Sequence, residues 1–313
     1  MELGLYTDSL PDHDLGAALD VAARVGATGS EIATGGQSSA PHLDMDELLG
    51  DPARRAAFAT AFASRGLHIA ALNCSAWPLH PVVGDRHVAI IRSTIRLAAE
   101  LGVQRIVTMS GSPGDGPSGT AVNFVFYPWP SESMALLERQ WDAAIRLWRD
   151  LAAEATAAGV ERLAFELHPL HLVYNVPTLQ RMQSAVGSII GANLDPSHLF
   201  WQGMDPLAVV RAIGPGIAHV HLKDTQISAK QVAIAGVLDQ RRFDDPDERA
   251  WVFRTVGAVH DRAWWTAFVA ALDAVGYDGV LAIENEDASL PPEESVTRGA
   301  AFMRGILDGA PRS

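Results

Sequence analysis

The segment Arg162-Leu-Ala-Phe-Glu-Leu-His168 is a short apolar run that ends in an acid and an imidazole. It lies between Gly159 and Pro169, and it is apolar on both faces, which is typical of a buried parallel strand. Glu166 and His168 are two positions apart, so their side chains point to the same side of that strand. The segment therefore predicts a buried strand that carries reactive groups at its carboxyl end.

Similar runs recur along the chain and alternate with helical patterns. Eight runs are predicted as strands, at residues 2 to 7, 29 to 33, 67 to 73, 105 to 111, 162 to 168, 189 to 195, 217 to 223 and 279 to 286. Helical periodicity lies between them, for example at residues 15 to 25, 87 to 101, 134 to 158 and 264 to 275. Four of these helices are followed by a glycine that we expect as a C-cap: Gly26, Gly102, Gly159 and Gly276.

This alternation predicts an α/β fold, namely a (β/α)8 TIM barrel formed as a single domain by residues 1 to 313. A chain of this length is close to the usual size of such a barrel. A doubly wound open sheet is the alternative architecture. It is disfavoured because the opening strand lacks the Gly-x-Gly-x-x-Gly turn of a dinucleotide fold.

The amino-acid composition is typical of a globular protein that folds without disulfides. Hydrophobic residues make up 48% of the 313 residues and charged residues 19%, which allows a sizeable core and opposes disorder. The net charge of -13 is spread along the chain, so we expect no nucleic-acid partner. Cys74 is the single cysteine, as expected of a buried thiol in a reduced, cytoplasmic protein. No run approaches the ~18 apolar residues of a membrane span, so we expect no membrane association.

Two connections are longer than the others, and both follow the carboxyl ends of predicted strands, the fourth and the seventh. The first covers residues 112 to 132 and contains Gly114-Asp-Gly-Pro117 and Phe124-Val-Phe-Tyr-Pro-Trp-Pro130. The second covers residues 225 to 261 and is rich in arginine and aromatic residues. Because barrel enzymes place functional loops at this end, we expect a lid or a docking surface, with structural padding of the rim as the alternative.

Four successive strands end in groups that bind metals. After the segment described first, the next three end in Asn193-Leu-Asp-Pro-Ser-His198, His219-Val-His-Leu-Lys-Asp224 and Ile283-Glu-Asn-Glu-Asp287. Each acid alone is as well explained by a turn or an ion pair. Considered together, these buried charges carry a large desolvation cost unless something compensates it. One divalent cation compensates several carboxylates at once. Carboxylates with one imidazole favour Mn²⁺, with Mg²⁺ or Co²⁺ as alternatives. His219 and His221 face the same side of their strand, so the pattern leaves open which of them binds.

These motifs resemble the xylose isomerase-like barrel family of sugar phosphate isomerases and epimerases, over essentially the whole chain. The resemblance implies a catalytic divalent metal ion held by Glu166, Asp195, His221 and Glu284. It implies that His198 contacts the substrate and that Arg254, in the second long connection, holds a substrate oxygen. The implied reaction removes a proton beside the carbonyl of a small-molecule keto sugar. In an epimerase, Glu166 and Glu284 serve as the opposed base and acid, which requires raised or metal-tuned pKa values.

A closer resemblance is to the large subunit of bacterial C-glycoside deglycosidases. It is carried by Glu166-Leu-His168, Tyr127-Pro-Trp-Pro130 and Asn193-Leu-Asp-Pro-Ser-His-Leu-Phe-Trp-Gln202. It implies a lyase that cleaves the carbon-carbon bond between a 3-oxo sugar and a polyphenol aglycone, with His168 as the base. It also implies an oligomer with a small second subunit. Trp129 and Trp201 are candidates to stack on a flat aglycone, and the alternative is an apolar rim buried against a partner.

Other functions stay open at this point. An inosose-type dehydratase shares the implied barrel and metal set, and it too loses a leaving group from an enolate. A non-catalytic sugar-binding barrel is a further alternative, although all four ligand positions are filled. An endonuclease that uses three zinc ions also belongs to this fold family, but the net charge of -13 opposes binding to DNA.

Overall fold

Eight parallel strands form a closed barrel in this computed structural model, which describes residues 1 to 116, 118 to 243 and 245 to 309. Pro117, part of the first long connection, lies outside the described residues. The order around the barrel is β1-β10-β7-β6-β5-β4-β3-β2. The strands are β1 (Glu2–Tyr6), β2 (Gly29–Ala33), β3 (His68–Asn73), β4 (Arg105–Thr108), β5 (Arg162–Glu166), β6 (Ile190–Leu194), β7 (Ile217–Leu222) and β10 (Val280–Ile283). All eight coincide with predicted strands, so the predicted TIM barrel is confirmed.

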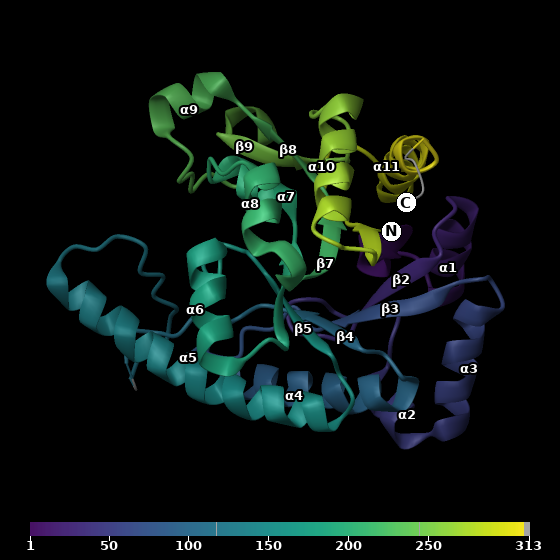
Figure 1. The fold of residues 1–313 in the computed structure, drawn as a ribbon, viewed down its shortest axis with the longest axis horizontal. Helices are drawn as coiled ribbons and strands as arrows, with labels where there is room; N and C mark the ends of the chain where they lie inside the picture. The colour runs from purple at the N-terminus through teal and green to yellow at the C-terminus, as the bar shows by residue number, and fades with distance from the viewer. Residues whose placement is uncertain (117, 244, 310–313) are drawn as a thin grey trace.

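Helices surround the barrel and alternate with its strands (Figure 1). They are α1 (Leu15–Arg24), α2 (Met45–Gly50), α3 (Pro52–Ala63), α4 (Gly84–Leu101), α5 (Ser131–Ala157), α6 (Val176–Val186), α7 (Pro196–Trp201), α8 (Pro206–Ile213), α9 (Ala229–Ala235), α10 (Arg262–Ala274) and α11 (Pro292–Leu307). The four expected C-cap glycines, 26, 102, 159 and 276, have φ values of 82°, 69°, 82° and 80°. These left-handed conformations end the helices as glycine does most readily.

Large side chains fill the layer between barrel and helices. Trp148 of α5 packs on Phe165 of β5 with ring centroids 4.4 Å apart, and both side chains are fully buried. Its indole Nε1 donates to the carbonyl oxygen of Ser110 at 2.8 Å, so the polar edge of this ring is also satisfied. Within the described parts of the chain, no helix combines the length and apolar character needed to cross a membrane.

The second long connection contains regular structure that the sequence pattern did not predict. β8 (Asp224–Ile227) and β9 (Trp251–Arg254) pair in antiparallel register, and α9 lies between them in the chain. Figure 1 shows this hairpin and α9 together at the top of the view. The strands are only four residues long and are joined by more than twenty residues, so no short turn signal marks them. The first long connection, residues 112 to 132, has no helix or strand in its described part until α5 begins at Ser131.

Two one-residue register shifts occur on strands that carry polar interior residues. Against β3, the pairing of β2 skips Ala70 between Ser30 and Glu31. Against β7, the pairing of β6 skips Ala218 between Ala192 and Asn193. Shifts of this kind re-aim side chains near functional sites. They help to place polar side chains in the barrel interior.

Candidate metal centre

Four side chains from consecutive strand ends converge at the carboxyl end of the barrel. Glu166 is the last residue of β5, Asp195 follows β6, His221 lies near the end of β7 and Glu284 follows β10. One carboxylate oxygen or ring nitrogen from each lies within 4.8 Å of the corresponding atom of every other. Asp195 also caps α7, because its Oδ1 accepts from the backbone N–H of Ser197 at 2.8 Å. The structure thus brings together the four predicted ligands.

His221, rather than His219, belongs to this cluster. Nδ1 of His221 lies 3.0 Å from Oε2 of Glu284, and the side-chain amide of Asn193 approaches the same nitrogen at 3.1 Å. Its other nitrogen, Nε2, faces away and lies 2.9 Å from Oε2 of Glu31. Nε2 of His219 contacts the same Glu31 oxygen at 2.6 Å. The two rings, which the strand pattern could not tell apart, thus differ in that Nδ1 of His221 points into the cluster.

A buried ammonium group contacts the carboxylates of the cluster. Nζ of Lys223 lies 3.0 Å from Oδ2 of Asp195, 2.7 Å from Oε2 of Glu284 and 2.7 Å from Oε2 of Glu286. Burial alone lowers the pKa of Lys223, but Asp195 and Glu284 outweigh it and hold that pKa well above its ordinary value. The lysine is therefore charged and compensates part of the negative charge of the site.

The two acids named as base and acid of an epimerase are strongly ionised. Burial raises the pKa of Glu284, but the charges of Lys223 and His221 outweigh burial and hold it well below the usual value. Burial also raises the pKa of Glu166, but the hydrogen bond from His198 and the charges of His198 and His221 together outweigh it, so the pKa is lowered. Neither pKa is raised, so both carboxylates are ionised.

His198 is held by two acids of the cluster. Its Nε2 lies 2.8 Å from Oε1 of Glu166 and 3.3 Å from Oδ2 of Asp195. Burial lowers the pKa of His198, but Asp195 and the hydrogen bond with Glu166 outweigh it and raise the pKa. Nδ1 of His198 is buried and has no hydrogen-bond partner among the described residues. When His198 is protonated, its Nδ1 presents an unused N–H donor.

His168 packs against His198 with ring centroids 4.3 Å apart. Its Nδ1 forms a hydrogen bond with the carbonyl oxygen of Pro169, and because a carbonyl only accepts, that nitrogen carries the proton. Burial lowers the pKa of His168 to about 4, so the ring is neutral near pH 7. Nε2 then holds the lone pair, as a base requires.

The three other residues that were predicted to contact the substrate differ in their surroundings. Arg254 of β9 donates to Oδ1 of Asp287 at 3.2 Å, three residues beyond Glu284. Trp201 is buried and stacks on Trp251 at 4.5 Å, so one face of its indole is already covered by the hairpin. Trp129 is 73% exposed and lies two residues before α5, whose first turns project beyond the barrel in Figure 1.

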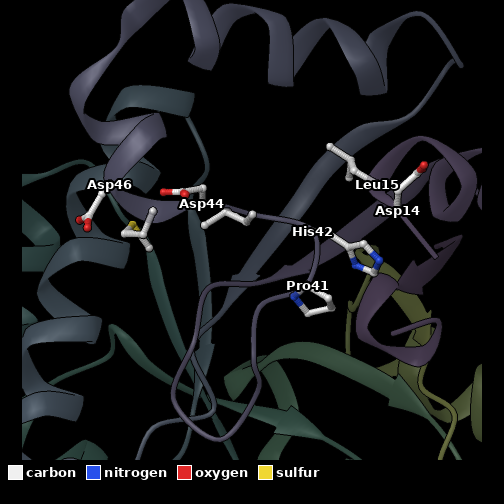
Figure 2. A pocket seen from close by; sticks show the side chains of 8 residues that line it. Asp14, Leu15, Pro41, His42, Asp44 and Asp46 are labelled. Atoms are coloured by element: carbon white, nitrogen blue, oxygen red, sulfur yellow. The ribbon is translucent and has the colours of Figure 1, made fainter. Parts of the chain in front are cut away.

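The hollow drawn in Figure 2, about 530 Å³, has no part in this chemistry. It is lined by Asp14, Leu15 and residues 41 to 46, none of which belongs to the cluster. The histidine in it, His42, is engaged by Oγ1 of Thr7 at 3.1 Å and the carbonyl oxygen of His13 at 3.0 Å. A hollow of about 190 Å³ lies closer to the cluster, since its lining includes Glu286, Phe253 and Arg254.

Glu31 is an interior acid that sequence reasoning missed. It is fully buried, and its carboxylate contacts both histidines of β7. Burial raises the pKa of Glu31, but His221 and His219 outweigh burial and lower the pKa to about 2. The available signal was a single acid within the otherwise uncharged strand Gly29-Ser-Glu-Ile-Ala33.

Comparisons with known proteins agree with this architecture. The sequence model described as "Xylose isomerase-like TIM barrel" matches residues 19 to 306. "Uncharacterized protein YfiH" of Bacillus subtilis (strain 168) is 40% identical over 311 residues, which are 98% of this chain and 99% of that protein. The probable 3-DHS dehydratase AsbF of Bacillus anthracis superposes with a TM-score of 0.67 at 14% identity, over 97% of this chain and 99% of the other. A D-psicose 3-epimerase crystallised with D-fructose superposes with a TM-score of 0.63 at 14% identity, over 99% of this chain and 100% of the other.

Proposed function

Since the chain belongs to the xylose isomerase-like TIM barrel family, we propose that it is a divalent-metal-dependent enzyme that removes a proton beside the carbonyl of a keto sugar or keto glycoside. One observation carries this proposal. Three carboxylates and one imidazole offer ligand atoms within 4.8 Å of one another, directly beside the neutral imidazole of His168. The proposal places a metal site and a base in one cluster.

The side chains of the cluster fit a hard divalent cation. Glu166, Asp195 and Glu284 supply oxygen, and His221 supplies Nδ1, which suits Mn²⁺ first and Mg²⁺ or Co²⁺ next. Oδ2 of Asp195 is buried and lies near Lys223, yet it accepts no hydrogen bond of standard geometry from the described residues. Such an oxygen has an unused lone pair for a cation. When bound, the cation would polarise the substrate carbonyl and stabilise the negative charge that develops on its oxygen.

The histidines would carry out the proton transfer and hold the substrate. Nε2 of His168 takes the proton from the carbon beside the carbonyl, and the electron pair of that C–H bond moves toward the carbonyl oxygen. Nδ1–H of His198, which lacks a partner, donates to a substrate oxygen. Arg254 lines the 190 Å³ hollow, and Lys223 contacts Glu286, which also lines it, so both cations would hold further oxygens.

The fate of the resulting enolate separates isomerisation or epimerisation from elimination. Epimerisation needs a second proton carrier on the opposite face, and both candidate acids, Glu166 and Glu284, have lowered pKa values. Elimination can proceed with one proton carrier, because the base that takes the proton can return it to the leaving group, and the neutral imidazole of His168 supports elimination as the second candidate function. That candidate includes C-glycoside deglycosidase activity on a 3-oxo-C-glycoside and dehydration of an inosose-like ketone.

We further propose that the chain acts in the cytoplasm as an oligomer, with or without a small second subunit. The support is the exposed aromatic segment before α5, in which Phe126 is 56%, Tyr127 61% and Trp129 73% exposed. Aromatic side chains of this kind are enriched in protein interfaces. Light scattering of the purified chain, alone and with its genomic neighbours co-expressed, measures the assembly.

The test is an NMR assay of Mn²⁺-loaded protein in D₂O with a panel of ketohexoses and a 3-oxo-C-glucoside, each with and without EDTA. Deuterium entering a ketohexose in an EDTA-sensitive manner supports isomerase or epimerase chemistry. EDTA-sensitive release of free aglycone supports the lyase instead. Binding of these sugars without exchange or release contradicts the enzyme proposal and indicates a binding protein.

A further inference from the structure

Glu31 sits below the proposed metal site, in the barrel interior. Its carboxylate accepts hydrogen bonds from Nε2 of His219 at 2.6 Å, from Nε2 of His221 at 2.9 Å and from the side-chain amide of Asn73 at 2.7 Å. β2 is separated from β7 by β1 and β10 in the closed order, so the histidine contacts cross the barrel. All three partners are N–H donors, and a carboxylate has the acceptor capacity for them.

These contacts determine which nitrogen of His221 keeps its proton when a cation binds. A carboxylate only accepts, so the atom of His221 that faces Glu31, Nε2, must be the N–H. A histidine that binds a metal ion uses the deprotonated nitrogen, which is then Nδ1. Nδ1 is the atom that lies 3.0 Å from Oε2 of Glu284, inside the ligand cluster, so without a cation this nitrogen also donates, to Glu284, and its proton is the one that a bound cation would replace. The side-chain amide of Asn193 lies 3.1 Å from the same atom.

The orientation of the ring is also fixed. Tyr6 stacks on His221 with ring centroids 5.7 Å apart and planes at 14°. A flip of the imidazole would put carbon atoms in the places of Nδ1 and Nε2, which takes the donor away from a buried carboxylate oxygen of Glu31. The carboxylate and the aromatic ring together leave His221 one direction in which to offer its lone pair.

Glu31, His219 and His221 could alternatively hold a cation of their own, because their ligand atoms also lie within 4.8 Å of one another. The hydrogen bonds argue against this, since the carboxylate is satisfied by three N–H donors of the chain. A cation there would have to displace the protons on both Nε2 atoms. A protein with two bound ions per chain is therefore a distinct outcome of the test.

We propose that Glu31 is a positioning residue of the metal centre: it keeps the proton of His221 on Nε2 and turns Nδ1 toward the cation. This inference rests on the proposed function, because it requires a cation at Glu166, Asp195, His221 and Glu284. Hydrogen-bond partners of metal-binding histidines are typically worth about 10- to 100-fold in metal affinity. Glu31 thereby acts on the metal without contacting it.

The first test titrates metal-free protein with Mn²⁺ and follows the free ion by EPR, for the wild type, Glu31→Gln and Tyr277→Phe. Tyr277→Phe is the control, because it also removes a buried hydrogen bond, from the Tyr277 hydroxyl to the Val280 carbonyl at 2.6 Å, without touching the cluster. We expect one ion per wild-type chain, an affinity about 10- to 100-fold lower in Glu31→Gln, and an unchanged affinity in Tyr277→Phe.

Each other result has a definite meaning. Equal affinity of the wild type and Glu31→Gln overturns the role of Glu31 and leaves the proposed function intact. Two ions per wild-type chain overturn it in favour of a second site. If the wild type binds no divalent ion, the proposed function fails together with the inference. Glu31→Asp, which keeps the charge on a shorter side chain, should recover part of the affinity.

A second measurement needs no variant and so does not depend on the folding of Glu31→Gln. Protein labelled with ¹⁵N-histidine is loaded with Zn²⁺ as a diamagnetic probe, and long-range ¹H–¹⁵N spectra report the protonated nitrogen of each ring. We expect His221 to carry its proton on Nε2 and its metal on Nδ1. Zinc on Nε2 of His221, or a proton on Nδ1, overturns the inference.

Discussion

Nζ of Lys223 lies 3.0 Å from Oδ2 of Asp195, so a fixed positive charge shares the same carboxylates that we propose as ligands of a divalent cation. The side chain is 2% exposed and also contacts Glu284 and Glu286. Removing one partner of such a buried ionic cluster is expensive, because the remaining charges lose their compensation.

Lys223→Met should therefore lower the free energy of unfolding of the metal-free protein by about 3 kcal/mol or more. Mn²⁺ should then raise the unfolding temperature more in Lys223→Met than in the wild type. The measurement is the unfolding temperature with EDTA and with Mn²⁺. Lys230→Met, at an exposed position of α9, is the matched control and should leave both temperatures unchanged. If Mn²⁺ raises the unfolding temperature equally in Lys223→Met and the wild type, the ammonium group of Lys223 and the cation do not share the same carboxylates, and this part of the account is contradicted.

Asp195→Asn should weaken Mn²⁺ binding at least 100-fold with little loss of helix capping, because an amide still caps a helix but is a far poorer ligand. Asp205 provides the control, since its Oδ1 caps α8 by accepting from Leu207 at 2.9 Å, at an exposed site away from the cluster. Calorimetric titration of both variants with Mn²⁺ separates the two roles. Similar affinities would show that Asp195 is only a cap.

His168→Gln should lower kcat for proton exchange by about 10²- to 10⁴-fold while leaving Mn²⁺ affinity unchanged, because this imidazole lies beside the ligands and is not one of them. The surface change His68→Gln should affect neither quantity. Deuterium exchange rates at saturating Mn²⁺, together with the metal titration, provide the comparison. A variant that keeps its exchange rate would remove His168 from the proton transfer.

Cys74 is fully buried, as expected from the sequence, and burial raises the pKa of its thiol from 9.0 to about 11. The thiol is protonated in the folded state but ionises in the unfolded state as the pH rises above 9. Between pH 8 and pH 10 the wild type should therefore lose about 1 kcal/mol more stability than Cys74→Ala. Urea unfolding of both proteins at the two pH values measures this, and equal losses would contradict the assigned pKa.

Much of the fold was predictable because each barrel strand is buried on both faces and reads as a local apolar run. The C-cap glycines were predictable for the same local reason. The hairpin β8/β9 was not, because its two short strands pair across more than twenty residues and no local turn signal joins them.

The site was predictable where it depends on strand ends and unpredictable where it depends on closure of the barrel. Glu166, Asp195 and Glu284 follow apolar strands, so their convergence follows from a parallel barrel. His219 and His221 lie on one face and both contact Glu31, and what distinguishes them is that Nδ1 of His221 also reaches Glu284. Glu31 is 188 residues away from His219 in sequence, and no local pattern links the two. The burial of Trp201 against Trp251 likewise depends on the hairpin.

The most direct measurement is anomalous diffraction at the manganese edge from crystals of Mn²⁺-loaded protein. The account predicts one strong peak per chain, coordinated by oxygens of Glu166, Asp195 and Glu284 and by Nδ1 of His221, with Lys223 displaced toward Glu286. A chain without a peak between these four side chains, in crystals where the titration shows the ion to be bound, would contradict the proposed metal centre.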